Sequence, residues 1–417
     1  MTNVVLLTSS LSREHIPVTG QTQLFYLLLE VMPTEVMAAV QMPLNFSLVL
    51  DVSGSMGGPK MRQLKEAVNL VIDSLNDDDF ISVVTFSTQT NTLFSSRPVG
   101  DAEQRQALKE QVQKLKARGG TNMASAMKAG LKEVKKRWAI DRVNRVVLLT
   151  DGETTKKKDC RKEAKHAAQL SIPFIGLGIG NDWNEDLLLE IADKSGGQAD
   201  YIADANQVTR YFQSTVQAMQ ATVVKNALLT LRLVTGVQPR KVWRVVPLIS
   251  DLGYKPLSER HVTVPLGELE KQQGQILLVE LMLSPRPAGT YRLAQAEISY
   301  DVPQLNLIQE KVRTDIIVNF TNDAKLARKL NPKVMNIVEK ITAFKLQTRA
   351  LQEAEAGNVS AATQKLRSAV TILLNQGDNE LAEAVQKEAD KLEQQGEISR
   401  EGKKTIKFKS TKTVRLK

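Results

Sequence analysis

The 417-residue sequence has little of several things, and each scarcity excludes a class of protein. A single cysteine, Cys160, permits no internal disulfide, which is typical of proteins from reducing compartments. The apolar run at residues 24–31 is too short to cross a membrane, and Glu30 interrupts it. Residues 1–5 carry no basic segment ahead of an apolar one, so we expect no secretory signal and a cytoplasmic protein.

Histidine is also scarce, which bears on catalysis. The three histidines lie outside every motif discussed below: His15, His166 and His261. A serine nucleophile would therefore lack a neighbouring base. Residues 57–61 do not contain the Gly-Lys-Ser/Thr of a phosphate-binding loop. Ser53 stands two residues after Asp51, where an aspartyl phosphatase would carry a second Asp. We expect no enzymatic activity.

Positive charge is unevenly distributed along the chain. The formal net charge is +10, and residues 400–417 contribute +7 of it through eight Lys or Arg residues and one Glu. The remainder is nearly neutral, so a general nucleic-acid-binding surface is not expected. The basic segment alternates apolar and basic residues. Two interpretations fit it equally: a disordered end, or a functional segment that is either a docking strand or a contact with an acidic surface.

From residue 43 to 220, apolar runs alternate with amphipathic segments. The expected strands are residues 46–50, 80–86, 145–149, 172–179 and 199–202. The expected helices are residues 59–75, 102–115, 123–138, 160–170, 183–194 and 208–219. Some of these strands are apolar throughout, which is typical of strands buried on both faces. The pattern predicts an α/β fold with a doubly wound, mostly parallel sheet covered on both faces.

The texture changes on either side of this segment. Residues 1–42 and 221–321 contain β-like runs separated by proline and glycine, which predicts a β-sandwich with the α/β domain inserted into it. Residues 322–399 have helical spacing of apolar side chains. Residues 400–417 form the basic tail.

Three oxygen-bearing side chains follow the first strand of the α/β segment. Asp51, Ser53 and Ser55 stand at alternate positions, and Gly54 permits a tight turn from which they converge. Three hard oxygens at this spacing suit a hard divalent cation. The sequence therefore indicates a metal site where this strand leaves the core.

Two further segments bring oxygens to the same edge of the sheet. Asp151 follows the buried run at residues 146–149, and Thr121 lies on a loop after Gly119 and Gly120. Ligands of open parallel sheets bind beyond the carboxyl ends of the strands, which is where both aspartates are expected. A serine or aspartate at a strand end can also be only a helix cap. Five such residues on three segments favour the metal site.

These motifs resemble a family. Residues 43–219 are similar to a von Willebrand factor type A domain with an intact metal-ion-dependent adhesion site. The matching pieces are residues 51–55, Thr121 after its two glycines, and Asp151 between Thr150 and Gly152. The flanking β-sandwich and helical region look like those of bacterial proteins that carry such a domain.

The resemblance implies roles for the five residues. Ser53, Ser55 and Thr121 would ligate the ion directly, while Asp51 and Asp151 would act directly or through water. Mg²⁺ is the ion usual in the family, and Ca²⁺ or Mn²⁺ also suits an all-oxygen site. Neutral hydroxyl ligands leave much of the cation's charge uncompensated, so an open position can accept a carboxylate from a protein partner.

Three functions remain open at this point. The first is cation-dependent protein–protein interaction of the adhesion type, with a partner that presents an acidic residue. The second is an intracellular Ca²⁺ or Mg²⁺ sensor, and the third is a chaperone-like adaptor for an AAA-type ATPase machine. Neighbouring polar residues receive simpler interpretations: Asn122 as a helix cap, Glu153 as a solvated side chain, and Cys160 as inert although nearby lysines favour a thiolate.

Overall fold

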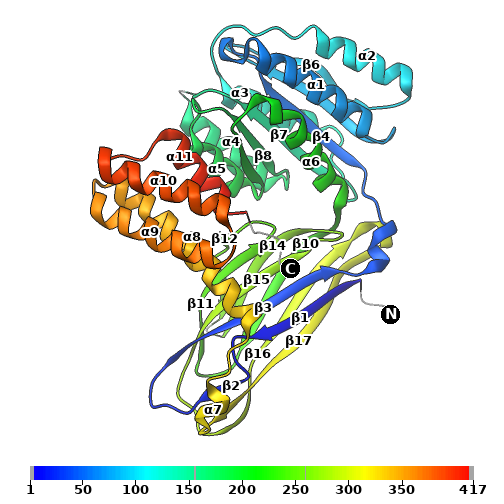
Figure 1. Cartoon of the computed structure of the whole chain (residues 1–417). Helices are drawn as coiled ribbons and strands as arrows, with labels where there is room; N and C mark the ends of the chain where they lie inside the picture. Colours follow the sequence, from blue (N-terminus) through cyan, green and yellow to red (C-terminus); the bar gives the residue numbers. More distant parts are fainter. Residues whose placement is uncertain (1–3, 155, 259, 413–417) are drawn as a thin grey trace. The chain divides into compact units, whose positions relative to one another are not determined.

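The computed structural model describes residues 4–154, 156–258 and 260–412, and the last five residues of the expected basic tail lie outside these ranges. The chain forms two compact units. We call Gln41–Thr222 the inserted unit, and Met1–Val40 together with Val223–Lys417 the outer unit. The outer unit is interrupted in sequence by the inserted one, and Figure 1 shows the elements of both.

The inserted unit contains strands and helices in alternation. Its strands are β4 (Leu44–Asp51), β5 (Phe80–Phe86), β6 (Thr90–Pro98), β7 (Val143–Thr150), β8 (Phe174–Ile179) and β9 (Gln198–Ile202). Its helices are η2 (Gly54–Met56), α1 (Pro59–Ser74), α2 (Ala102–Gln113), α3 (Met123–Lys135), α4 (Lys157–Gln169), α5 (Glu185–Ser195), η3 (Ala205–Gln207) and α6 (Val208–Ala221). The order in the sheet is β6-β5-β4-β7-β8-β9.

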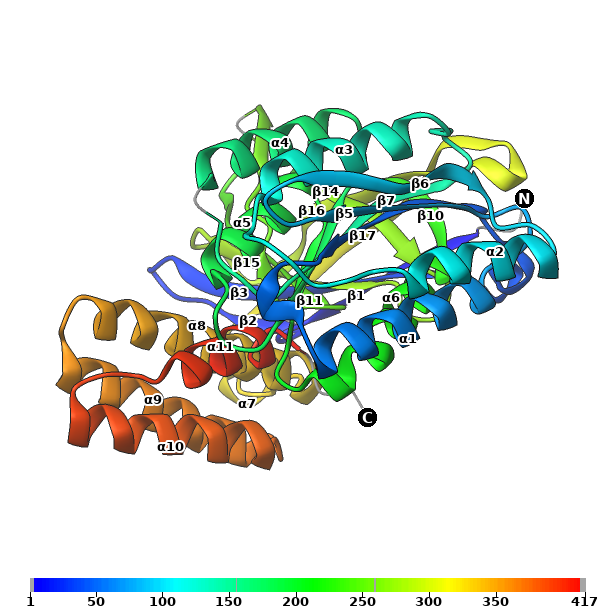
Figure 2. The same ribbon diagram turned by 90° about the horizontal axis from the view of Figure 1, so that it is seen from above.

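This sheet is parallel except at one edge, where β6 pairs antiparallel with β5. Helices α1, α2 and α6 cover one face and α3, α4 and α5 the other (Figure 2). Every residue of the central strand β4 is buried, as a strand covered on both faces requires. The expected doubly wound α/β fold is confirmed. Strand β6 was not expected, because its Thr, Ser and Asn residues do not form an apolar run.

The strands of the outer unit form two sheets. One has the order β1-β3-β15-β11-β12 and the other β13-β14-β10-β16-β17-β2. The strands are β1 (Val5–Leu11), β2 (His15–Pro17), β3 (Gln23–Pro33), β10 (Thr222–Leu233), β11 (Val237–Val246), β12 (Ser250–Asp251), β13 (Lys255–Ser258), β14 (His261–Glu270), β15 (Gln275–Leu283), β16 (Gly289–Val302) and β17 (Leu307–Thr321). The short helices η1 (Glu35–Ala39) and η4 (Pro303–Leu305) lie between strands.

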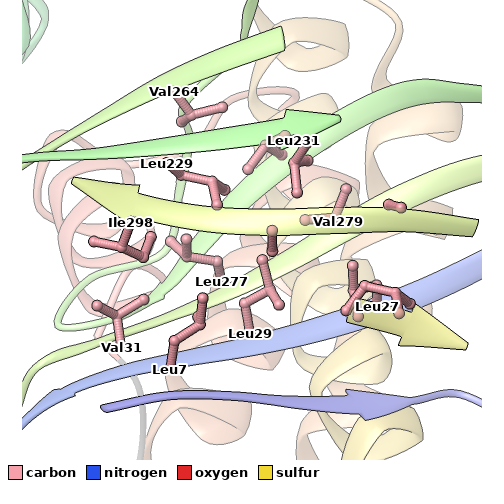
Figure 3. Close-up of a cluster of buried hydrophobic side chains, with 14 of the residues drawn as sticks. Leu7, Leu27, Leu29, Val31, Leu229, Leu231, Val264, Leu277, Val279 and Ile298 are labelled. Carbon is pink, nitrogen blue, oxygen red and sulfur yellow. The ribbon is translucent and has the colours of Figure 1, made fainter. Parts of the chain in front are cut away.

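The two sheets share one apolar core. Leu27 and Leu29 of β3 and Leu277 of β15 belong to the same cluster as Leu229 and Leu231 of β10 (Figure 3). Strands β1, β3, β15, β11 and β12 of the first sheet pair antiparallel, as do β13 with β14, β10 with β16 and β16 with β17, whereas β17 and β2 pair parallel. The sandwich is therefore built from two separate stretches of the chain: β1, β2 and β3 precede the inserted unit, and the strands from β10 onward follow it.

The helices of the outer unit follow the sandwich. They are α7 (Ala324–Ala327), α8 (Pro332–Glu355), α9 (Val359–Asn375), α10 (Asn379–Gln395) and α11 (Arg400–Lys409). Val334, Ile337 and Ile341 of α8 pack against Trp243 and Leu278 on the outer face of the sheet that contains β3. This second covered face explains why β15 is buried almost without alternation.

The start of the expected basic tail is a helix that belongs to the helical bundle. Ile406 and Phe408 of α11 are buried, and Ile406 joins the core formed by α8, α9 and α10. The backbone N–H of Ile249 donates to the carbonyl of Thr411 over 2.7 Å. The alternation of apolar and basic residues reflects an amphipathic helix, and not a docking strand, over Arg400–Lys409. None of the helices seen in the described ranges is long and apolar enough to cross a membrane.

Candidate metal centre

The predicted oxygen ligands lie beyond the carboxyl ends of β4 and β7. These two strands are neighbours in the sheet, and Asp51 ends β4 while Asp151 follows β7. Helix α1 leaves β4 on one face and α4 leaves β7 on the other, which is the arrangement that opens a crevice in doubly wound sheets. The sequence-based placement of both aspartates is therefore what the structure has.

Asp51 is fully buried, and its hydrogen-bond donors among the described residues are neutral. Its Oδ1 accepts from the Ser53 backbone N–H at 2.9 Å, and its Oδ2 accepts from the Thr150 hydroxyl at 2.8 Å. Burial raises the pKa of the Asp51 carboxyl above its ordinary value, and this effect exceeds the lowering by the hydrogen bonds from Ser53 and Thr150. Among the residues that the structure describes, no cation directly compensates the ionised carboxylate.

A chain of three oxygens continues from the turn after β4 to Asp151. The hydroxyls of Ser53 and Ser55 are 3.1 Å apart, and the Ser55 hydroxyl donates to Asp151 Oδ1 at 2.7 Å. Ser53 and Asp151 are 2% and 1% exposed, whereas Ser55 is exposed. The oxygens therefore sit on a buried floor that opens to solvent on the side of Ser55.

Thr121 reaches the same place from the third segment. Its hydroxyl lies 3.3 Å from where a Cβ on Gly152 would be, next to Asp151. Its loop is tied to the turn after β4, because the backbone N–H of Gly54 donates to the Gly119 carbonyl at 3.0 Å. Gly119 has φ +76°, and a Cβ there would meet the Thr88 hydroxyl at 2.9 Å, so glycine is needed at this position.

Two residues near the site were not expected. Lys60, on the first turn of α1, places its ammonium on Asp151 Oδ2 as a salt bridge. Thr150, the last residue of β7, orients Asp51 as described above. In the sequence, residues 57–61 were compared only with a phosphate-binding loop, which they do not match. The signal that could have identified Lys60 is its position shortly after the predicted serine ligands, at the start of the expected helix.

The donor set fits a small divalent cation. An octahedral Mg²⁺ with oxygens at about 2.1 Å has neighbouring ligand oxygens about 3.0 Å apart. The Ser53–Ser55 and Ser55–Asp151 oxygen separations, 3.1 and 2.7 Å, bracket this value. The Thr121 hydroxyl, which makes no hydrogen bond to another described residue, is available as a further ligand. No cluster of three or more His, Cys, Asp or Glu residues suited to a metal occurs within the described ranges, so the hydroxyls are indispensable here.

Three neighbouring residues bear on the simpler interpretations. Asn122 stands at the N-cap position of α3, but its side chain does not cap the helix, and its buried Oδ1 has no partner in the described part of the chain. Glu153 is exposed and pairs with Lys157 at 3.7 Å. Cys160 is buried, and burial raises its pKa to about 12, so it is an unreactive thiol at neutral pH.

Comparison with known proteins defines the class. The sequence model of the von Willebrand factor type A domain matches residues 45–215, and that of the Sll0103-like C-terminal alpha-helical domain matches residues 332–416. A solved von Willebrand factor type A protein from Catenulispora acidiphila superposes with a TM-score of 0.81 at 21% identity, covering 98% of this chain and 97% of that one. At this identity the likeness establishes the fold, including the helical region.

The relatives identify the family. The uncharacterized protein sll0103 of Synechocystis is 32% identical over 286 residues, which are 67% of this chain and 67% of that protein. The chain belongs to the same family, the Sll0103-like proteins with a von Willebrand factor type A domain. The inter-alpha-trypsin inhibitor heavy chain H2 of mouse is 32% identical over 169 residues, but these span only 18% of its length.

Proposed function

We propose that this protein binds a divalent cation at Asp51, Ser53, Ser55, Thr121 and Asp151, and through it a carboxylate of a protein partner. The observation that carries the proposal is the run of oxygens from Ser53 through Ser55 to Asp151 at octahedral ligand spacing. A von Willebrand factor type A domain typically mediates protein interactions, which agrees with this use of the site.

The charges of the proposed ligands determine how much positive charge the bound ion would present to a partner. When bound, the cation supplies a Lewis-acidic position that a partner's carboxylate can occupy. Three of the proposed ligands are neutral hydroxyls, so they leave more positive charge on the ion than an all-carboxylate cage would. Ser55 lies at the exposed side of the site, and this is the side from which a partner would approach.

Binding, and not catalysis, is the proposed activity. The hydroxyls of Ser53 and Ser55 have each other and Asp151 as hydrogen-bond partners, and no histidine lies on the segments that form the site. Asp51 is buried behind Ser53 and Thr150 and is thereby kept from contact with a substrate. These features suit residues that orient a metal, since a nucleophile would require an adjacent base.

Affinity capture at saturating Mg²⁺, compared with capture in chelator, tests the proposal. We expect capture of a defined protein to require Mg²⁺ and to be lost in Asp151→Ala. Thr121→Ala removes no charge, so it should retain weak metal binding while it loses most of the capture. The Thr121 loop depends on two glycines and is the contact most easily rearranged when a partner engages.

The controls separate interaction from cation sensing. Metal binding by each variant is measured by calorimetry in parallel, so that loss of capture is not confused with loss of the ion. Equal capture by wild type and Thr121→Ala at saturating Mg²⁺ would show that this loop does not govern the partner. Capture that is unaffected by chelator would contradict a metal-mediated contact altogether.

A further inference from the structure

A basic groove lies beside the candidate metal centre. It runs between α1 and the segment that follows α2, and its lining residues include Gly57, Met61, Arg62, Lys65 and Lys116. Gly57 and Ala117 approach each other at the end nearest the site, where a Cβ on Gly57 would lie 4.0 Å from the Ala117 Cβ. The groove is therefore bordered by the same two loops that carry Ser55 and Thr121.

The groove and the metal centre are close enough to serve one ligand. Gly57 is two residues from Ser55, so their Cα atoms are at most about 7.6 Å apart. The loops are held together by the Gly54–Gly119 hydrogen bond and by the Arg118 backbone N–H, which donates to the Val52 carbonyl at 2.7 Å. An extended peptide advances about 3.3 Å per residue. If one residue of such a peptide binds the metal, the residues that follow it would reach the groove.

The charges of the groove are mostly positive. Arg62 and Lys116 are exposed, and neither has an ion-pair partner among the residues that the structure describes. Lys65 donates its ammonium to the carbonyl of Gln113 at 2.7 Å, which directs it across the groove. Glu66 is the acidic member of the lining. Three cations against one carboxylate favour an acidic occupant.

We propose that the partner's metal-binding carboxylate belongs to an acidic segment, and that further acidic residues of this segment lie in the groove against Arg62 and Lys116. This inference rests on the proposed function, because the metal centre fixes one end of the segment. The groove would supply selectivity: a lone surface carboxylate gains the metal contact only, whereas an acidic segment gains the ion pairs as well.

A labelled peptide tests the inference on the full-length protein. The probe is a fluorescein-labelled 12-residue peptide with one Asp and four Glu, and its companion has the four Glu changed to Gln. Fluorescence anisotropy is measured in Mg²⁺ and in chelator, at low and physiological salt. The variant is Arg62→Gln/Lys116→Gln, and the charge-matched control is Lys128→Gln/Lys132→Gln on exposed positions of α3.

The expected result is that wild type binds the acidic peptide about three- to tenfold more tightly than its companion, and that added salt reduces this ratio. The Arg62→Gln/Lys116→Gln variant should bind both peptides alike, while the control keeps the wild-type ratio. A preference that survives in Arg62→Gln/Lys116→Gln overturns the groove assignment, as does the absence of any preference in wild type. The Mg²⁺ dependence of the affinity for either peptide reports separately on the proposed function. If wild type prefers the acidic peptide equally in Mg²⁺ and in chelator, the metal-mediated contact is refuted while the groove assignment stands.

Discussion

Two buried carboxylates, Glu297 in the sandwich and Asp51 in the inserted unit, are compensated differently. Glu297 in the sandwich is 4% exposed and is bound by Arg232 at 3.0 Å and by Arg313, and these arginines lower its pKa to about 2. Asp51 in the inserted unit is fully buried, its donors within the described part of the chain are neutral, and burial raises its pKa. Glu297 is neutralised by arginines of the protein itself, whereas Asp51 has no cation among its hydrogen-bond partners in the described residues and would be compensated by the proposed metal ion.

Glu280 strengthens the contrast. It is 3% exposed, accepts from Trp243 Nε1 at 2.9 Å, and pairs with Lys345 of α8 at 2.5 Å. Lys345 also lies 4.7 Å from the centre of the Trp243 ring. This buried carboxylate therefore attaches α8 to the sandwich. Glu297 and Glu280 are thus buried acids that hold the outer unit together through their own cations, whereas Asp51 is a buried acid whose partners in the described residues are neutral.

The largest expected effect is on Asp51→Asn. This change keeps the size of the side chain but removes the charge that would balance the cation, so Mg²⁺ affinity should fall more than a hundredfold, about 2.7 kcal/mol. In chelator its stability should equal or exceed that of wild type, because an uncompensated buried charge has been removed. Calorimetric titration and thermal unfolding measure the two quantities. A clear loss of stability in chelator would mean that Asp51 is structural, like Glu297.

Ile406→Ala tests whether α11 belongs to the outer unit. The side chain is 1% exposed in the core of the helical bundle, so its truncation should lower the free energy of unfolding by about 2.5 kcal/mol. Lys409→Gln, on the same helix in a surface pair with Glu380, should cost under about 0.5 kcal/mol. Scanning calorimetry compares the two variants. Equal melting temperatures for both would indicate that α11 is only loosely attached.

Glu297→Gln should destabilise the protein, the reverse of Asp51→Asn in chelator. The loss at pH 7 should be about 2 kcal/mol, because two arginines lose their shared carboxylate while remaining partly exposed. The pKa is depressed from 4.5 to about 2, so the contribution is complete above pH 4.5 and disappears as pH falls toward 2. Denaturant unfolding across this range should show the two proteins converging in acid. A pH-independent difference would refute the ion-pair explanation.

Lys60→Met should have the smallest effect and in the opposite direction to Asp51→Asn. The Lys60 ammonium is 28% exposed and pairs with Asp151, so a cation must compete with it or be repelled by it. Its removal should raise Mg²⁺ affinity about tenfold, with Lys128→Met as an exposed control. Titration calorimetry of the two variants would decide it. Weaker binding by Lys60→Met would show that the lysine supports the ion and does not compete with it.

The α/β fold was predictable because its signals are local. Continuous apolar runs such as residues 46–50 and 146–149 identify buried parallel strands without knowledge of their neighbours. The placement of Asp51 and Asp151 followed from strand ends alone. Strand β6 was not predicted, because an edge strand does not require an apolar run: most of its residues are partly or fully exposed.

Long-range pairing was less accessible to sequence reasoning. The apolar side chains of α11 were visible, but the bundle core that buries Ile406 comes from helices up to about 60 residues away in the chain. Residues 132–137 show only a mostly basic run in the sequence, yet Lys136 pairs with the buried Glu133 at 2.6 Å. Lys60 likewise meets Asp151 across 91 residues of sequence. Such partners become apparent only once the fold brings the segments together.

The most direct test of the account is to locate the metal. Crystals of the full-length protein grown with Mn²⁺, examined at the manganese absorption edge, would show the ion by its anomalous scattering. The account predicts one strong peak among the hydroxyl oxygens of Ser53 and Ser55 and the carboxylate of Asp151, with the Lys60 ammonium displaced from Asp151. A map with no peak there, and with Lys60 still paired to Asp151 at saturating Mn²⁺, would contradict it.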